Sequence, residues 1–246
     1  MKTQEKNFDG IKLSGFTAIL IMLALTGTAI YLLSLPQTPS IIAGVICGIC
    51  VVVMLPGFMI IQPNNSRVLT FFGRYAGTVI SNGFYWVNPL FLKSTVTLRI
   101  LNLNIDPIKV NDKVGNPIMI GAVVVWRIKD TYKASFDISG NIREFVQIQS
   151  DAALRQVAGM YAYDTNETID KVTLRSDESG EITQRLEDEL NSRLAIAGIE
   201  IVEARINYLA YASEIASVML RRQQADAIIS ARERINVEEL KSVVYQ

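Results

Sequence analysis

A run without any charged side chain dominates the first quarter of the chain. No Asp, Glu, Lys or Arg occurs from Leu13 to Ser66, although charged residues make up 20% of the 246 residues. The run contains two apolar segments, Leu13–Leu35 and Ile41–Ile61, joined by a short stretch with two prolines. As helices they would be about 34 Å and 31 Å long, enough to cross a hydrocarbon core of about 30 Å. We therefore expect a two-helix membrane hairpin over residues 13–61, preceded by a tail of residues 1–12.

The charges that flank the run indicate the orientation of the hairpin. Lysines precede the first segment, arginines follow the second, and the connection between the segments carries neither (the residues are Lys2, Lys6, Lys12, Arg67 and Arg74). By the positive-inside tendency, both ends face the cytoplasm. A cleaved signal peptide is the alternative for the first segment, but the segment is too long and no small-residue cleavage pattern follows it. We expect a two-span protein of the cell inner membrane with its main domain in the cytoplasm.

Small residues on the second span favour close helix packing. Gly44 and Gly48 form a G-x-x-x-G motif, which places both glycines on one helix face. The partner of this face would be Thr26 and Gly27 of the first span, or a second copy of the chain. Cys47 and Cys50 form a C-x-x-C pattern in the same apolar run, and we interpret them as packing residues rather than a metal or redox site.

Composition excludes several classes of function. The formal net charge is zero and no block of like charges occurs, which argues against a nucleic-acid partner. The chain has no histidine, so Ser-His-Asp and Cys-His sites and the usual catalytic zinc sites are absent. The carboxylates of Glu187–Glu189 fit a solvated helix face better than an acid–base pair. We predict no catalytic residue, cofactor or metal.

The segment after the spans has the pattern of an antiparallel sheet. Arg67–Phe72 is rich in β-branched and aromatic residues, Ser94–Ile108 alternates apolar and polar residues, and Pro117–Ile128 is a strong strand pattern. An aromatic cluster, Phe84, Tyr85 and Trp86, lies between the first two of these strands. It could fill the core of the sheet or lie among lipid headgroups, and its closeness to the spans favours the membrane interface.

Helical patterns follow. Asn141–Tyr161 has apolar residues at helical spacing, a repeat of Ile182, Leu186, Leu190 and Leu194 ends at Gly198, and Ile199–Leu209 returns to a strand pattern. We expect both helices to cover one face of the sheet, which gives an α+β fold.

The last 34 residues favour one long helix. Residues 213–246 contain no Gly or Pro, and their apolar residues form a broken stripe. The stripe could be part of a solvated helix or could pack between copies of the chain, and we favour packing. The predicted oligomerisation residues are Ile215, Met219, Ile228 and Ile229.

Several of these stretches carry a resemblance to a known family. "RVLTFFGRYAGTV", "GFYWVNP", "LNIDPIKVNDKVGNPIMIGAVVVWRI", "AALRQVAGMYAYD" and "NYLAYASEIASVMLRRQQADAIISARERI" resemble the SPFH family (stomatin, prohibitin, flotillin), also called Band 7, and more closely its bacterial members with two N-terminal spans. The resemblance covers Arg67 to about Ile235. It implies an α+β domain at a membrane and a long helix that assembles into rings or cages, with no catalysis.

The expected organisation is therefore a tail, the hairpin, an SPFH domain over residues 67–209 and an assembly helix over residues 213–246. The expected function is a membrane-anchored scaffold that forms a large homo-oligomeric ring or cage and organises a membrane patch or restrains membrane proteins. The alternative is a regulatory subunit that binds a membrane protease, such as an AAA-type protease, or a transporter. A hydrolase with a histidine-free site is a weaker third class. Lipid and further copies of the chain are the expected partners.

Overall fold

The computed structural model of the chain describes residues 5–164, 172–176, 180–222, 224–225, 228–229 and 232. Contacts within the chain divide it into two compact units. The first, called the hairpin unit, comprises residues 1–101, 126–142 and 194–200. The second, called the sheet–helix unit, comprises residues 102–125, 143–193 and 201–246.

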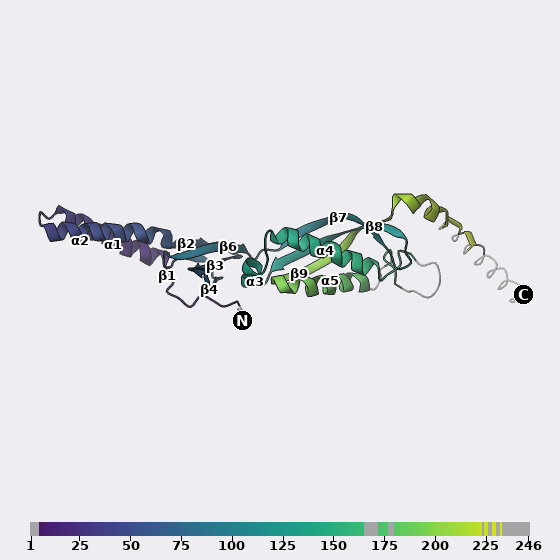
Figure 1. The fold of residues 1–246 in the computed structure, drawn as a ribbon, viewed down its shortest axis with the longest axis horizontal. Helices are drawn as coiled ribbons and strands as arrows, with labels where there is room; N and C mark the ends of the chain where they lie inside the picture. The colour runs from purple at the N-terminus through teal and green to yellow at the C-terminus, as the bar shows by residue number, and fades with distance from the viewer. Residues whose placement is uncertain are drawn as a thin grey trace, which may run out of the picture. The chain divides into compact units, whose positions relative to one another are not determined.

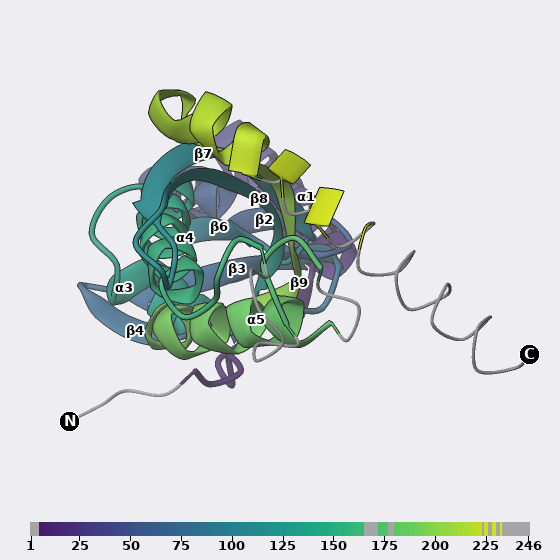
Figure 2. The ribbon, with the colours of Figure 1, turned by 90° about the vertical axis from the view of Figure 1, so that its right-hand side faces the viewer.

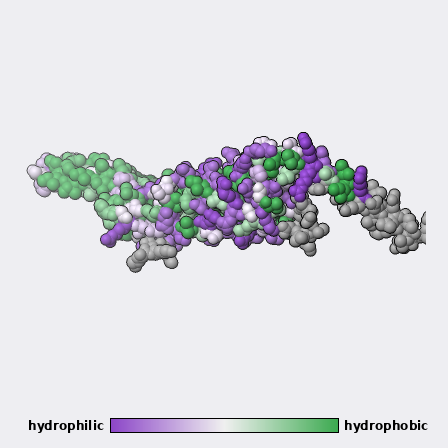
Figure 3. All heavy atoms as spheres, turned by 45° about the vertical axis from the view of Figure 1, so that its right-hand side comes forward, coloured by the Kyte–Doolittle hydropathy of each residue, from purple (hydrophilic) through white to green (hydrophobic). Residues whose placement is uncertain are grey.

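Two apolar helices begin the hairpin unit. They are α1 (Gly15–Ser34) and α2 (Thr38–Met54), which lie side by side in Figure 1. The helical stretches Gly15–Ser34 and Thr38–Gly57, of which the second continues α2 by one further turn, are each long and apolar enough to cross a membrane. Most of their large side chains are exposed, and Figure 3 shows a continuous hydrophobic surface over this part of the molecule. The predicted pair of N-terminal apolar helices is confirmed.

The second helix ends earlier than the sequence predicted. After Met54 the chain makes a 3-10 turn, η1 (Leu55–Gly57), and then a strand, β2 (Phe58–Ile61). Pro56 lies at the start of the turn and lacks the N–H that would continue an α-helix. The following residues pair with another strand instead. The prediction of helix to Ile61 was therefore too long.

A small sheet joins the two ends of the helical hairpin. Its strand order is β1–β5–β2, where β1 is Leu13–Ser14 and β5 is Gly83–Trp86, and both pairings are antiparallel. Trp86 lies opposite Leu13 on one side and Phe58 on the other. The strand that precedes α1 and the strand that follows α2 thus share one partner strand.

The second sheet of the hairpin unit has the order β4–β3–β6. Its strands are β3 (Asn65–Phe71), β4 (Arg74–Val79) and β6 (Phe91–Thr97). The predicted strand near residues 67–72 is confirmed, but the predicted strand Ser94–Ile108 is two strands, because β6 ends at Thr97 and the next strand begins at Leu101. A buried apolar cluster lies between this sheet and the small one, and it comprises Met59, Ile61, Leu69, Val79 and Val87.

The tail before α1 adds a further segment to the edge of β4. Asn7 forms a parallel bridge with Thr78. The Thr78 N–H donates to the Lys6 carbonyl at 2.9 Å, and the Phe8 N–H donates to the Thr78 carbonyl at 3.0 Å. Phe8 also packs against the buried cluster and meets the Phe91 ring edge-on at 5.3 Å. Residues 5–12 of the tail are thus an ordered part of the hairpin unit.

Residues from later in the chain complete the hairpin unit. A short helix, α3 (Thr131–Phe136), is capped by the Asp130 side chain, which accepts from the Lys133 N–H at 3.0 Å. The 3-10 turn η2 (Ala195–Ala197) ends at Gly198, whose φ of +68° is left-handed. This is the helix stop that the sequence predicted at Gly198.

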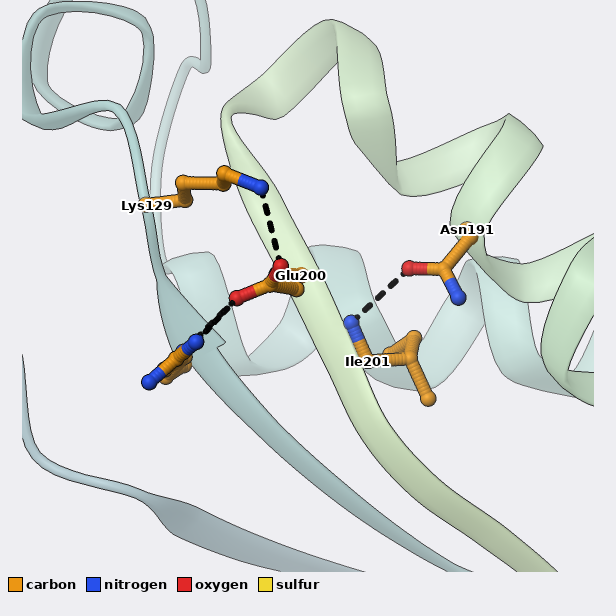
Figure 4. A network of polar contacts seen from close by, with 5 residues as sticks. Lys129, Asn191, Glu200 and Ile201 are labelled. Atoms are coloured by element: carbon orange, nitrogen blue, oxygen red, sulfur yellow. Dashed lines mark hydrogen bonds and ion pairs between the residues drawn. The ribbon is translucent and has the colours of Figure 1, made fainter.

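Ion pairs fix the first residues of the strand that follows. Glu200 accepts from Lys129 Nζ at 2.9 Å, as Figure 4 shows, and from Arg127 Nε at 2.7 Å. These hydrogen bonds, the one from Lys129 first, hold the pKa of Glu200 below its usual range.

The third sheet and two long helices supply most of the sheet–helix unit. The strand order is β7 (Leu101–Asn111), β8 (Pro117–Ile128) and β9 (Ile199–Tyr211), and the helices are α4 (Ile142–Ala158) and α5 (Glu181–Leu194). Figure 2 shows α4 and α5 on the same side of this sheet. The apolar residues that they turn inward are almost fully buried, among them Val146, Ala153, Leu154, Val157, Ile182, Leu186 and Leu190. The predicted α+β architecture is confirmed.

The chain continues as a helix after β9. Residues 213–222 are helical, as are the described residues 224–225, 228–229 and 232. The rest of the helix predicted over 213–246 lies outside the described residues.

Candidate membrane and assembly surfaces

Gly44 of α2 packs directly against α1. A Cβ at Gly44 would come within 2.8 Å of Leu33 Cγ and 3.1 Å of the Ala29 carbonyl oxygen, so only glycine fits without a shift. Gly48 has no such neighbour, and neither does Gly27 of α1. Within one copy the close approach therefore involves Gly44 with Ala29 and Leu33. The packing role of Gly48 stays a prediction, and its open space leaves room for another helix.

The aromatic cluster forms the middle strand of the small sheet. Phe84, Tyr85 and Trp86 are all half-buried. The Phe84 ring stacks on Phe58 and meets Phe16 of α1 edge-on, each at 5.6 Å between ring centroids. Trp86 Nε1 donates to the Met54 carbonyl at 2.9 Å, at the end of α2. These residues thus lie at the ends of both apolar helices, and their contact with lipid stays a prediction.

Lys93 of β6 caps the same helix end. Its Nζ donates to the carbonyl of Pro56 in η1 and to that of Phe58 at 3.4 Å. Burial, with Arg67 nearby, lowers the pKa of Lys93. A cation here suits the partial negative charge at a helix C-terminus and satisfies carbonyls that lack helical partners.

The predicted oligomerisation residues divide into two groups. Ile215 and Met219 are half-buried within the chain itself. Ile228 is 57% exposed and Ile229 is 55% exposed, and Val218 and Leu220 on the same helix are also exposed. At the spacing of the helix predicted from the sequence, Ile229 would continue the face of Val218, whereas Ile228 would lie about 100° around the helix. The exposed group is the one that a neighbouring copy could cover.

An ion pair and a ring contact lie at the start of this helix. Lys109 Nζ of β7 pairs with the Glu214 carboxylate, and this hydrogen bond holds the pKa of Glu214 below its usual range. At the end of β9, the ring centroids of Tyr211 and Tyr163 are 4.0 Å apart. Burial, followed by the nearby Asp164, raises the pKa of Tyr211 to about 12.

The carboxylates of α5 have structural partners. Glu187 accepts from the Ala204 N–H of β9 at 3.1 Å, Asp188 accepts from Gln184 at 3.1 Å, and Glu189 pairs with Arg193 at 2.6 Å. A similar contact runs from the Ile201 N–H to Asn191, as Figure 4 shows. Side chains of α5 thus bind N–H groups of β9, which supports the interpretation of Glu187–Glu189 as structural.

One carboxylate in α4 has unusual surroundings. Asp151 Oδ1 is buried without a hydrogen-bond partner among the described residues, and burial raises the pKa of this carboxyl. No histidine or cysteine accompanies it, and the described residues contain no group of three His, Cys, Asp or Glu side chains that could hold a metal ion.

Sequence reasoning missed the contacts of the tail. Glu5 accepts from the Thr131 hydroxyl at 2.5 Å, and the Thr131 and Thr78 hydroxyls are 2.9 Å apart. Lys12 Nζ lies 4.7 Å from the centroid of the Tyr85 ring. Nothing in the local pattern of residues 5–12 predicts these long-range pairings. The only available signal was the presence of cations just before an apolar helix.

Comparison with family models shows that the chain matches the SPFH domain / Band 7 family over residues 59–241. The match begins in β2 and extends beyond β9 into the C-terminal helix. The comparison with curated proteins gave no significant match. The family model covers far more than half of the chain and agrees with the resemblance of the quoted stretches. The chain, with its two N-terminal apolar helices, belongs to the SPFH domain / Band 7 family.

Proposed function

We propose that the chain is a non-enzymatic scaffold subunit, anchored in the inner membrane by α1 and α2, that assembles side by side into a ring or cage. The assembly would organise a patch of membrane or restrain membrane proteins within it. The observation that carries this proposal is the pair of exposed isoleucines, Ile228 and Ile229, on a helix that follows a membrane-anchored domain. Family membership supports it, because SPFH proteins are generally scaffolds and typically oligomeric.

The apolar positions define the expected energetics of assembly. Full burial of an isoleucine is worth about 1.5–3 kcal/mol, and about half of each side chain is still exposed, so each would add about 0.8–1.5 kcal/mol per copy. Repeated around a ring, such contributions accumulate. A charged side chain at the same place would have to lose its hydration instead.

The test is the double variant Ile228→Glu and Ile229→Glu. Size-exclusion chromatography in mild detergent should show a fall from a large particle to small species. The controls are Ile228→Leu with Ile229→Leu, which keeps both positions apolar, and Ala216→Glu, which adds negative charge at an exposed position that lies more than about 100° from both isoleucines at helical spacing. Both should leave the particle intact. A large particle that persists in the isoleucine variant would mean that this helix is a solvated arm. A wild-type protein that is small but is recovered bound to an AAA-type membrane protease would favour the regulatory subunit.

The membrane orientation has its own test. With Cys47 and Cys50 replaced by Ala, a new cysteine at Gln37, between the spans, should react with a membrane-impermeant reagent in cells with a permeabilised outer membrane. A new cysteine at Asn141 should react only after the inner membrane is opened. Labelling of the Asn141 position in closed cells would contradict the cytoplasmic placement.

A further inference from the structure

A cavity lies between the N-terminal tail and the end of β4. Its volume is about 370 Å³, and it is lined by Asn7, Phe8 and Lys12 on one side and by residues 78–81 on the other. None of the described residues that line it is acidic. All of its walls belong to the hairpin unit.

Among the described residues that line the cavity, Lys12 is the one cation, and it is held in place. Its Nζ donates to Ser81 Oγ at 3.2 Å and lies over the Tyr85 ring, 4.7 Å from the centroid. Within the described part of the chain, no carboxylate forms an ion pair with it. A hydroxyl and an aromatic face orient an ammonium group without neutralising it. The Nζ of Lys12 therefore has further N–H donors available for an anion.

The beginning of α1 adds to the positive potential nearby. The first turn of α1 contains no acidic residue, and the side chain of its N-cap, Ser14, makes no capping hydrogen bond. The first N–H groups of a helix carry a partial positive charge that favours anions. Lys12 precedes this helix by three residues, but the first turn of α1 is not among the residues that line the cavity, so its contribution acts at a distance.

The position of Lys12 indicates where the anion would come from. Because α1 begins at Gly15 and is apolar throughout, Lys12 would lie at the depth of the lipid headgroups. Two apolar side chains near the cavity are exposed, Ile11 at 75% and Ile80 at 48%. A ligand with a phosphate beside apolar chains fits this combination better than a free ion.

We propose that this cavity binds the phosphate of an anionic phospholipid headgroup through Lys12, with Ser81 and Tyr85 as positioning residues. The proposal rests on the membrane anchorage proposed above but not on assembly. It would give the hairpin unit a fixed lipid neighbour at the point where the chain enters the membrane. It also makes Lys12 a ligand residue as well as a contributor to the orientation of the hairpin.

The experiment measures the lipid retained by the full-length protein. The wild type and the Lys12→Gln variant are purified in mild detergent, mixed with phosphatidylglycerol or phosphatidylcholine, and examined by native mass spectrometry. One basic side chain near a membrane surface accounts for about a fivefold preference for an anionic lipid, so Lys12→Gln should lower phosphatidylglycerol retention by about fivefold and leave phosphatidylcholine unchanged. Lys12→Arg should restore most of it.

The matched control is Lys6→Gln, which removes an equal charge from the same tail but outside the cavity. An equal loss of phosphatidylglycerol in both variants would mean general charge attraction and would overturn the site. Displacement of the lipid by millimolar inorganic phosphate would also overturn it, in favour of a free-phosphate site. If the wild type retained neither lipid, the site would be overturned. The anchorage is tested separately, because an anchored protein should be recovered in the membrane fraction before detergent is added. Thermal unfolding of each variant verifies that the fold is intact.

Discussion

Gly77 gives the sharpest test of the ordered N-terminal tail. Its φ is +145°, and a Cβ there would lie 2.7 Å from Phe8 Cα and 2.9 Å from the Phe8 nitrogen. Both neighbours are backbone atoms, so no side-chain rotation can relieve the collision. Gly77→Ala should therefore push the tail away from β4.

The contacts at risk set the size of the effect. The tail is held by two backbone hydrogen bonds with Thr78 and by the bond from the Thr131 hydroxyl to the Glu5 carboxylate. Two neutral hydrogen bonds are worth about 1 kcal/mol each and a charge-assisted one about 1.5–3 kcal/mol, which together give about 3.5–5 kcal/mol. Loss of these bonds should speed amide exchange at Phe8 and Thr78 by at least about a hundredfold, if the protected state opens locally.

Hydrogen exchange followed by mass spectrometry on the full-length protein in detergent measures this directly. Gly115→Ala is the matched control, because Gly115 has a φ of +98° but no heavy atom within 4 Å of the added Cβ. It imposes backbone strain without the collision, and tail exchange should stay at the wild-type rate. The reasoning is refuted if Gly77→Ala leaves the tail protected, or if Gly115→Ala opens it equally.

Three further predictions concern Leu190, Tyr211 and Trp86. Leu190→Ala should destabilise the sheet–helix unit by about 2–5 kcal/mol in denaturant unfolding, because Leu190 is fully buried, while Ile196→Ala at an exposed position should cost less than about 0.5 kcal/mol. The pKa of Tyr211 is raised from 10.0 to about 12, so between these pH values the folded state binds more protons than the unfolded state, and the free energy of unfolding should fall as the pH rises. The fall should be shallower in Tyr211→Phe. An unchanged dependence of the free energy of unfolding on pH would contradict the assignment. In Trp126→Phe, Trp86 is the sole tryptophan, and brominated lipids should quench its fluorescence if β5 lies at the membrane interface; unquenched emission would place these rings away from lipid.

Local signals in the sequence were sufficient for several elements. The charge-free run predicted α1 and α2, because neither helix depends on a distant partner to be recognisable. The four-residue repeat of Ile182, Leu186, Leu190 and Leu194 predicted the buried side of α5, and all four side chains are almost fully buried. Gly198 was recognisable as a stop because a left-handed residue after a helix is usually glycine.

The misjudged elements are those decided by tertiary pairing. Phe58–Ile61 is an apolar run of four residues that fits a helix end or a strand equally well, and its pairing with β5 decides between them. No glycine or proline lies between Thr97 and Leu101, so the local sequence gives no sign that the strand ends there. The pairing of the tail with β4 joins residues about 70 positions apart, and no local pattern encodes such a contact.

Pairing at the base of the hairpin also constrains how the chain can enter a membrane. The strand before α1 and the strand after α2 both pair with β5, so the complete small sheet requires both helix ends on the same side. If only one helix crossed the bilayer, β5 could reach one of these strands but not both, and the other would lose its backbone partners. The uncharged connection between the helices and the cations that flank them favour the same hairpin by an independent electrostatic route. The hairpin topology and the folded small sheet therefore depend on each other. A change that inverts one span should also unfold the sheet that contains Trp86.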